Sequence, residues 1–529
     1  MVLVVILALP LLGGAVVGAW GRRTADGASG HAAGWVAVAT NGAALGLGIW
    51  TSVRVVGTGP LVGAAGVLRA DALSAFMVVV IGAVAVLASW LGVRTMALEL
   101  AGGRCTPARA ATYGVLVQAF VATMLLAVLA ANVGVLWVAV EATTVVTTFL
   151  VGHRRTKGAL EASWKYIVIC SVGIALAFFG TVLVYLCALH AGGRSAGALD
   201  WTSLMANAHH LDPSVLRLGF ALVVLGYGTK VGLAPMHSWL PDAHSQAPAP
   251  ISALMSGVLL TVAFYAILRF KAVADLAVGP GFSRTLLVIV ALLSLAVAAS
   301  LLVAQRDYKR MLAYSSIEHM GLIALGAAAG VPLAVAAVLL HVLGHGLAKS
   351  VLFLTSGEIM AAEETSRIDG VRALLARRPV LGGVFGVGLV ALLGLPPFSL
   401  FSSELLMARA EFRVGLGWAA VAAVGAMVVI FVAVVGHARH MLLGPPTTTE
   451  GPGGTGAPGT TGAPDATEPP GTTEGPSTTE PPGTTGALAP PPTWVAAPLV
   501  GGLVVCGLIG VFAWPLSGLL HAAAHVVTP

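Results

Sequence analysis

Long apolar runs separated by short polar loops fill most of this chain. Fourteen runs approach the roughly 20 residues that an α-helix needs to cross a bilayer, and they lie at 2–20, 33–56, 72–95, 111–130, 132–152, 164–190, 216–235, 249–270, 284–304, 311–329, 332–356, 379–402, 416–441 and 494–520. The pattern predicts an all-α polytopic membrane protein with about 14 transmembrane helices. The composition agrees, since 57% of the residues are hydrophobic and 9% are charged, whereas soluble domains carry about 25% charged residues.

Basic residues gather in the loops that follow the odd-numbered spans. These residues are Arg22, Arg23, Arg154, Arg155, Lys157, Arg306, Lys309, Arg310, Arg367, Arg372, Arg377 and Arg378. Because cytoplasmic loops are enriched in Lys and Arg, these loops are predicted to be cytoplasmic and both chain termini to lie outside. The loop after the eighth span, with Arg269, Lys271 and Arg284, goes against the rule without outweighing the others. The apolar start of the chain lacks a basic n-region and predicts a retained helix, not a cleaved signal.

Two predicted spans are interrupted by glycine and proline, which break helices. The seventh span, 216–235, runs into KVGLAPMHSWLPDAHSQAPAP, and the twelfth, 379–402, contains GLPPFSLF. Broken helices at membrane depth are tolerated where they line a cavity or are buried in protein. Because the breaks lie five spans apart, and an odd number of spans inverts a repeat, the pattern predicts two inverted five-helix repeats.

The predicted repeats divide the chain into five parts. These are three N-terminal helices in 1–110, the first repeat in 111–270, the second in 271–443, a linker in 444–492 and a last helix in 493–529. The linker is rich in Pro, Gly and Thr and contains EPPGTTE and EPPGTTG. Such a composition cannot form a core, so the linker is predicted to be disordered and cytoplasmic.

Ionisable side chains occur inside some of these apolar runs. A charge at mid-membrane costs about 3 kcal/mol on insertion scales and marks a functional site by default. Glu141 lies in the middle of its span, about 14 Å from either end, and Lys230 adjoins the first break. A nearby carboxylate stabilises a buried ammonium group, so moving Glu141 would change how readily Lys230 releases a proton. Lys230 is therefore the first candidate partner of Glu141.

The eleventh predicted span carries a ladder of three ionisable residues. His341, His345 and Lys349 are four residues apart, so they share one helix face and extend over about 12 Å. His319 in the tenth span is placed to join them, and Glu404 follows the second break. Such a ladder can pass protons laterally between helices.

Two other interpretations of the histidines stay open. One is a haem or zinc site at His341 and His345, and the other is structural hydrogen bonding between helices. A bis-histidine haem needs ligands on opposite faces of the ring, whereas these two share a helix face, and the chain has no H-E-x-x-H motif.

Cofactor motifs are missing elsewhere in the sequence. No cysteines form a C-x-x-C pair; the four are Cys105, Cys170, Cys187 and Cys506. They are expected to be small apolar core residues, and no G-x-G-x-x-G or P-loop opens a helix. The chain is therefore predicted to hold no cofactor and no metal.

The chain resembles the antiporter-like membrane subunits of respiratory complex I, group 4 membrane-bound hydrogenases and multisubunit cation/proton antiporters. The stretches that carry the resemblance are KVGLAPMHSWLPDAHSQAPAPISAL, QRDYKRMLAYSSIEHMGLIALG, HVLGHGLAKSVLFLTSG and GLPPFSLFSSELL. It covers the fourth to thirteenth spans and looks most like the hydrogenase-4 or formate-hydrogenlyase component F branch. The resemblance implies that Glu141 and Lys230 form a paired switch. It also implies proton-transfer roles for His319, His341, His345, Lys349 and the terminal glutamate, Glu404.

The eighth span departs from this family pattern. Some quinone-linked relatives have a lysine near Thr261 and a histidine near Ser256, where this chain has no ionisable group. A link between Lys230 and Lys349 would then need ordered water or the hydroxyls of Ser256 and Thr261.

These inferences predict a proton-translocating subunit of a multisubunit oxidoreductase, either hydrogenase-4-like or NADH:quinone oxidoreductase-like, in a bacterial plasma (inner) membrane. The expected partners are other membrane subunits and soluble redox subunits. The expected transported ions are protons or sodium. Nucleic acid is not an expected partner. The chain itself is expected to have no redox centre. One alternative is a subunit of a cation/proton antiporter or an inorganic-carbon uptake system, and another is a non-pumping scaffold. Sodium transport without a redox partner would favour the first, and wild-type transport by Lys230→Ala would favour the second.

Overall fold

The computed structural model describes residues 1–23, 27–192, 197–445 and 492–528, so nearly all of the predicted linker lies outside the described residues. Within them the chain is almost entirely helical, which confirms the all-α membrane fold class. The α-helices are α1 (Val2–Arg23), α2 (Gly27–Thr58), α3 (Ala72–Ala101), α4 (Pro107–Leu129), α5 (Val133–Val151), α6 (Lys157–His190), α7 (Trp201–Ala206), α8 (Pro213–Val231), α9 (Trp239–Gln246), α10 (Ala249–Leu254), α11 (Leu260–Val278), α12 (Pro280–Leu302), α13 (Tyr308–Ala329), α14 (Pro332–Glu363), α15 (Leu374–Arg377), α16 (Pro379–Leu392), α17 (Ser399–Arg413), α18 (Gly417–Leu443), α19 (Thr493–Val511) and α20 (Trp514–Val527).

Twelve segments of the described chain are long and apolar enough to cross a membrane. Two other predicted spans take a different form. The helix α13 carries Lys309, Arg310 and Glu318 and is therefore less apolar, while the segment 379–402 is shared between α16 and α17. The predicted total of fourteen depends on counting these two as spans, and it stays a prediction.

Both predicted helix breaks are present. After Val231, the chain turns at Gly232, whose φ of 82° is left-handed, and resumes a helix at Trp239. The second break separates the end of α16 at Leu392 from the start of α17 at Ser399. The two interruptions therefore lie where glycine and proline predicted them.

Three features differ from the sequence prediction. The expected single helix 494–520 is two helices, because Pro515 cannot continue α19 and instead lies in the first turn of α20. An unpredicted antiparallel hairpin, β1 (Leu61–Gly63) and β2 (Leu68–Ala70), precedes α3. Arg269 and Lys271, expected in a loop, are buried within α11.

The eighth span contains a short π-helical segment. It lies at Met255–Leu259, between α10 and α11, and includes Ser256. Such π-bulges are rare overall but are often found at functional sites. They free a backbone carbonyl from the regular hydrogen bonds of the helix.

A close helix contact positions the residues near Lys230. The helices α6 and α8 pack closely against each other. A Cβ atom at Gly226 of α8 would lie 2.4 Å from the backbone nitrogen of Ala177 and 2.6 Å from the Gly173 carbonyl oxygen. Only glycine permits this approach, which brings the end of α8 against the middle of α6.

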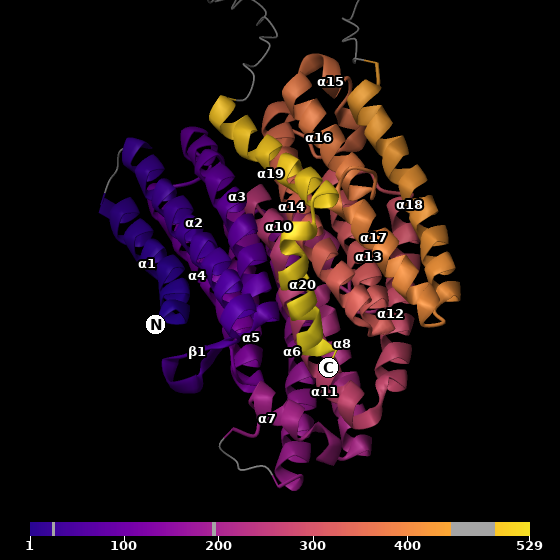
Figure 1. The fold of residues 1–529 in the computed structure, drawn as a ribbon. Coiled ribbons are helices and arrows are strands. Elements are labelled where there is room, and N and C mark those ends of the chain that lie inside the picture. The colour runs from indigo at the N-terminus through magenta and orange to yellow at the C-terminus, as the bar shows by residue number, and fades with distance from the viewer. Residues whose placement is uncertain (24–26, 193–196, 446–491, 529) are drawn as a thin grey trace, which may run out of the picture.

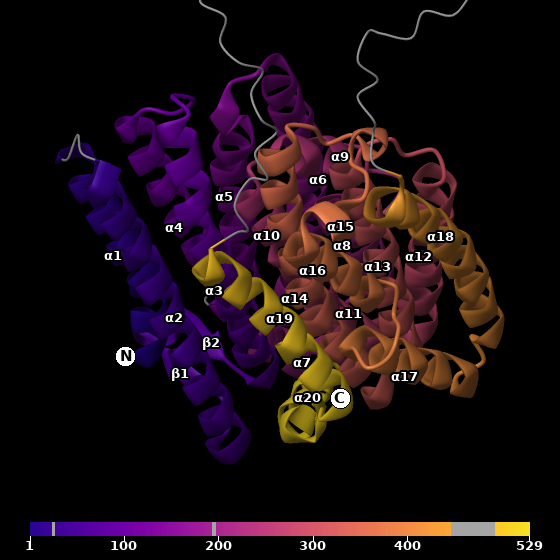
Figure 2. The same ribbon diagram turned by 90° about the horizontal axis from the view of Figure 1, so that it is seen from above.

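The helices form a bundle around α14. Figure 1 shows α1 to α4 on one flank and α18 on the other, and Figure 2 shows the same order from above. The helix α14 contacts α3, α10, α13, α16, α17, α19 and α20, and α19 crosses in front of it in Figure 1. The ionisable ladder on α14 therefore lies in the centre of the molecule, away from the outer helices.

Candidate functional site

Hydroxyl groups enclose the ammonium group of Lys230, which has no exposed surface. Its Nζ donates to the Thr144 hydroxyl of α5 at 2.8 Å and to the Tyr166 hydroxyl of α6. Nζ also lies 4.6 Å from the centroid of the Tyr166 ring, within range of a cation–π interaction. The buried lysine at the end of α8 is thus held by side chains of α5 and α6.

Glu141 does not pair directly with Lys230. Among the described residues, no carboxylate oxygen of Glu141 lies within the 4.0 Å ion-pair distance of Nζ, and Glu141 Oε2 is buried without a hydrogen-bond partner. Glu141 and Thr144 are three residues apart and therefore share a face of α5. The Thr144 hydroxyl, one helical turn further along α5, contacts the ammonium group instead, so the predicted partnership of Glu141 and Lys230 stays a prediction without a direct contact.

Aromatic side chains pack at the break between α8 and α9. Trp239 Nε1 donates to the Thr229 carbonyl at 2.8 Å, and the Trp239 ring packs at 5.0 Å from Tyr166. This arrangement satisfies a carbonyl at the end of α8. The break therefore helps to fix the tyrosine that contacts Lys230.

His244 of α9 is a candidate that residue-by-residue reasoning missed. It is fully buried, its Nδ1–H donates to the Leu240 carbonyl at 2.8 Å, and its Nε2 has no partner among the described residues. Its ring lies 5.7 Å from Phe353 of α14, one turn from Lys349. The signal was present in PDAHSQAP, within a stretch that carried the family resemblance.

Three histidines meet in the bundle centre, as the ladder predicted. His319 of α13 and His341 of α14 lie 3.0 Å apart between Nδ1 and Nε2, and the rings of His319 and His345 are 4.9 Å apart. All three are at most 1% exposed. The structure therefore brings together residues 22 and more positions apart in the sequence.

Hydrogen bonding indicates how these rings are protonated. The Ser403 hydroxyl donates to the Leu400 carbonyl, so it accepts from His341 Nδ1–H at 2.9 Å. His341 Nε2 then accepts from His319 Nδ1–H. His319 Nε2 is left as an acceptor without a partner among the described residues.

The remaining ring leaves a second free acceptor. His345 Nε2–H donates to the Ser256 carbonyl of the π-helical segment at 3.3 Å, so Nδ1 carries the lone pair, and Nδ1 has no partner in the described chain. Two neighbouring imidazoles thus each present an unused nitrogen that can accept a proton.

Lys349 lies one helical turn from His345 and is fully buried. Its Nζ donates to the Leu312 carbonyl and the Ser315 hydroxyl of α13. Like Lys230, it is surrounded by neutral acceptors and has no carboxylate within ion-pair distance among the described residues. A proton donor held in this way can give up its proton without breaking a salt bridge.

Glu404 of α17 lies against the second helix break. A Cβ atom at Gly394 would lie 2.2 Å from its Oε2, so the left-handed glycine, with φ of 61°, makes room for this carboxylate. A carboxylate oxygen lies within 4.8 Å of ring nitrogens of His319 and His341. The structure therefore joins Glu404 to the histidines. Two imidazoles and a carboxylate are also zinc donors, so the metal interpretation stays open at this point.

The eighth span provides hydroxyl groups near the polar groups of α13 and α14. The Ser256 hydroxyl lies 2.8 Å from the Ser316 hydroxyl of α13, and Thr261 donates to the Val258 carbonyl at 2.9 Å. Only Ser256 therefore makes a contact between helices that extends the line of polar groups from α14.

Lys309 and Arg269, both predicted in loops, are buried. Lys309 has no exposed surface, and its Nζ donates to the carbonyls of Ser245 and Ala247 at 2.8 and 2.9 Å, closing the end of α9. Arg269 donates to the Asp71 carboxylate at 2.7 Å. Both acceptor sets come from distant parts of the chain, so no local pattern could identify them.

The chain belongs to the NADH:quinone oxidoreductase/Mrp antiporter transmembrane family, whose model matches residues 130–430. It is 43% identical over 337 residues to the hydrogenase-4 component F homolog of Methylacidiphilum infernorum, covering 63% of this chain and 70% of that protein. The resemblance stated from sequence motifs is thereby confirmed.

Solved structures share the fold. A chain of the archaeal membrane-bound sulfane sulfur reductase matches with a TM-score of 0.81 and 23% identity, covering 100% of this chain and 98% of the other. A chain of the Mrp complex from Dietzia sp. DQ12-45-1b matches with a TM-score of 0.77 and 22% identity, covering 99% and 97%. At this identity the likeness concerns the fold alone.

Proposed function

We propose that this chain is the proton-translocating membrane subunit of a multisubunit oxidoreductase of the hydrogenase-4 or NADH:quinone oxidoreductase kind. The observation that carries the proposal is the buried line formed by Lys349, His345, His319, His341 and Glu404, which crosses three helices. A buried ionisable group is costly in a membrane protein unless it serves a function. Here such groups lie next to one another, as proton transfer between them requires.

Proton transfer in this proposal begins at Glu141 and Lys230. A partner subunit moves or protonates Glu141, which changes the electrostatic stabilisation of the Lys230 ammonium, whose own contacts are neutral hydroxyls. The proton then passes by ordered water and hydroxyls to Lys349. The free nitrogens of His345 and His319 accept it next, and Glu404 exchanges it with one side.

Redox chemistry belongs to the partners in this proposal. Soluble redox subunits would supply the free energy, and other membrane subunits would flank the bundle. The basic loops after odd-numbered spans would face the bacterial cytoplasm, with both termini outside. The ends of α18 and α19 that flank the linker lie opposite the chain termini in Figure 1, which supports this arrangement.

The test uses the native complex, purified through a tag on this chain and reconstituted into vesicles. We expect Lys349→Ala to lower proton uptake per redox turnover by about 100-fold, because a relay group contributes roughly that much to proton transfer. Lys165→Ala is the matched control, since Lys165 is a surface lysine, 46% exposed, and should leave uptake unchanged.

Other outcomes would identify other functions. Wild-type uptake by both Lys349→Ala and Lys230→Ala would contradict the proposal and indicate a scaffold. Sodium-driven proton movement without any redox subunit would indicate an antiporter. Mass spectrometry of the complex identifies the partners, and a nickel–iron subunit would support the hydrogenase branch.

A further inference from the structure

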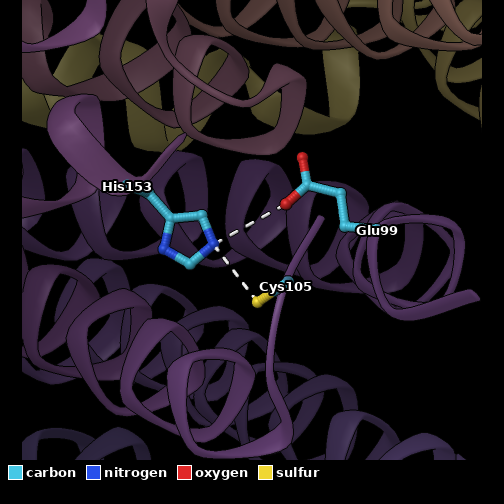
Figure 3. Close-up of side chains that lie close together, drawn as sticks. All are labelled: Glu99, Cys105 and His153. Atoms are coloured by element: carbon cyan, nitrogen blue, oxygen red, sulfur yellow. Dashed lines mark hydrogen bonds and ion pairs between the residues drawn. The ribbon is translucent and has the colours of Figure 1, made fainter. Parts of the chain in front are cut away.

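A second cluster of chemically active side chains lies outside the proton line. Glu99 is in the last turn of α3, Cys105 lies in the loop before α4, and His153 lies in the 3-10 turn after α5 (Gly152–Arg154). Figure 3 shows the three side chains converging, with His153 between the thiol and the carboxylate. None of them takes part in the proposed proton transfer.

The geometry matches three ligands of one metal ion. His153 Nε2 lies 3.7 Å from Glu99 Oε2 and 3.9 Å from Cys105 Sγ, and all three donor atoms lie within 4.8 Å of one another. Bonds of about 2.0 to 2.3 Å in a zinc tetrahedron place neighbouring ligands about 3.3 to 3.6 Å apart. Small side-chain adjustments would therefore close the three donors around an ion, leaving the fourth position for water.

The backbone holds these donors in place. The amides of Arg104 and Cys105 both donate to the Glu99 carbonyl, at 2.9 and 3.2 Å, which folds Cys105 back over the end of α3. Arg109 of α4 donates to the His153 carbonyl. Cys105 is 7% exposed, and the side chains of Glu99 and His153 are 6% and 8% exposed. The cluster is thus built and nearly closed to solvent.

The surroundings suit a metal ligand set. Arg154 binds the other carboxylate oxygen, Glu99 Oε1, at 3.0 Å and so orients Oε2 toward the histidine. Outer partners of this kind commonly orient metal ligands. Tyr113 packs at 4.9 Å from the His153 ring, and its buried hydroxyl has no partner among the described residues.

We propose that Glu99, Cys105 and His153 form a binding site for one divalent transition metal ion of the zinc class. The Cys105 thiol loses its proton to solvent on binding, and the metal–thiolate bond replaces the S–H bond. The carboxylate and the thiolate together offset the ion's two positive charges, and Arg154 adds one positive charge beside them. The bound metal joins the ends of α3 and α5 and the start of α4, and α5 also carries Glu141.

Cobalt(II) titration of the full-length chain in detergent tests the site, because cobalt in a zinc site reports thiolate ligation by a charge-transfer absorption band. We expect the wild type to show this band with one cobalt per chain and to lose it on adding zinc. Cys105→Ser, which is nearly isosteric, should abolish the band. Cys187→Ser, at another buried cysteine, should retain it.

Zinc affinity measured by competition gives a second test. Glu99→Gln and His153→Ala should each weaken zinc binding by about tenfold or more, since even outer partners of metal sites are worth that much. Size-exclusion chromatography confirms that each variant is folded. A wild type without the band, or a band that survives in folded Cys105→Ser, would overturn the proposal.

Discussion

At the scale of single residues, this protein surrounds the buried ammonium groups of Lys230 and Lys349 with neutral groups. Lys230 and Lys349 both donate to hydroxyls, and Lys349 also donates to a carbonyl. Full ion pairs inside a protein hold a proton firmly, whereas neutral acceptors let the ammonium group respond to a distant charge. The residues of the line are therefore suited to exchange protons.

Ser256 is expected to be the link on the eighth span. Ser256→Ala removes the hydroxyl that lies 2.8 Å from Ser316 but leaves the carbonyl that accepts from His345. Proton uptake should fall severalfold, while stability should change by only about 1 kcal/mol, the usual worth of one hydrogen bond. Ser300→Ala on α12, which removes an exposed intrahelical hydrogen bond, is the control. Unchanged uptake in Ser256→Ala would exclude this hydroxyl from the path.

Asp71 and Arg269 form a buried pair whose loss should be costly. Each is 6% exposed, and Asp71 Oδ1 also caps α3 by accepting from the Ser74 amide. Asp71→Asn keeps the cap but leaves the guanidinium unpaired, which should destabilise the fold by about 3 to 5 kcal/mol. Thermal unfolding in detergent measures this loss. Asp369→Asn, at an exposed pair with Arg367, should have little effect; equal losses at the two sites would contradict the argument.

The same pair predicts a pH dependence. Burial acts to raise the pKa of the Asp71 carboxyl, but the Arg269 charge and hydrogen bonds outweigh it and hold the pKa below its usual value. A lowered folded-state pKa stabilises the fold above the unfolded pKa of about 3.9, and this contribution is lost as the pH falls through the folded value. The difference in melting temperature between wild type and Asp71→Asn should therefore stay constant from neutral pH down to about pH 5. A difference that shrinks within this range would show that the carboxyl is not held ionised.

At the scale of helices, close backbone contacts and breaks decide where the ionisable groups lie. The helix α8 reaches α6 through Gly226, and the breaks after α8 and α16 place Lys230 and Glu404 beside non-helical backbone. The π-helical segment of the eighth span turns one carbonyl toward His345. These irregularities supply polar contacts that a straight apolar helix cannot.

Gly226→Leu should separate α6 from α8. The added side chain would meet the backbone of Ala177 at 2.4 Å, and overpacking of this kind costs about 1 to 3 kcal/mol or more. We expect a lower melting temperature and loss of proton uptake together, because the Tyr166–Lys230 contact depends on this packing. Gly425→Leu on α18, where nothing lies within 4 Å of an added Cβ, should be tolerated. Equal melting temperatures for the two variants would show that the contact is unimportant.

At the scale of the whole molecule, the last two helices complete the bundle. Trp90 of α3 donates to the Trp494 carbonyl at 2.9 Å, and Ser402 of α17 donates to the Gly510 carbonyl at 3.0 Å. Leu499 is 1% exposed and Cys506 is fully buried. The helices α19 and α20 also contact α14, so they close part of the bundle around it.

A protease site inserted into the segment 446–491 tests this closure. After cutting, we expect α19 and α20 to remain bound and to co-elute with the larger fragment, because their contacts are tertiary. Leu499→Asp should release them, since a buried unpaired charge is strongly unfavourable, whereas Ser517→Asp on the exposed face of α20 should not. Release of the wild-type fragment on cutting would contradict the prediction.

Much of the fold was predictable because membrane insertion depends on local composition. Apolar length and the positions of glycine and proline are properties of short stretches, and they located twelve of the predicted spans and both breaks. The division of 494–520 into α19 and α20 and the hairpin before α3 were missed. A proline inside an apolar run and a four-residue turn are weak signals beside strong hydropathy.

The sequence by itself determined that several ionisable groups lie inside apolar spans and that three of them share one face of α14, because apolar length and helical periodicity are local. Only the tertiary structure decided their partners. The rotation and packing of helices set Lys230 against Thr144 and not Glu141, buried Lys309 and Arg269, and gathered Glu99, Cys105 and His153 from three separate segments. Partner choice depends on distances between helices far apart in the chain, and no local pattern contains them.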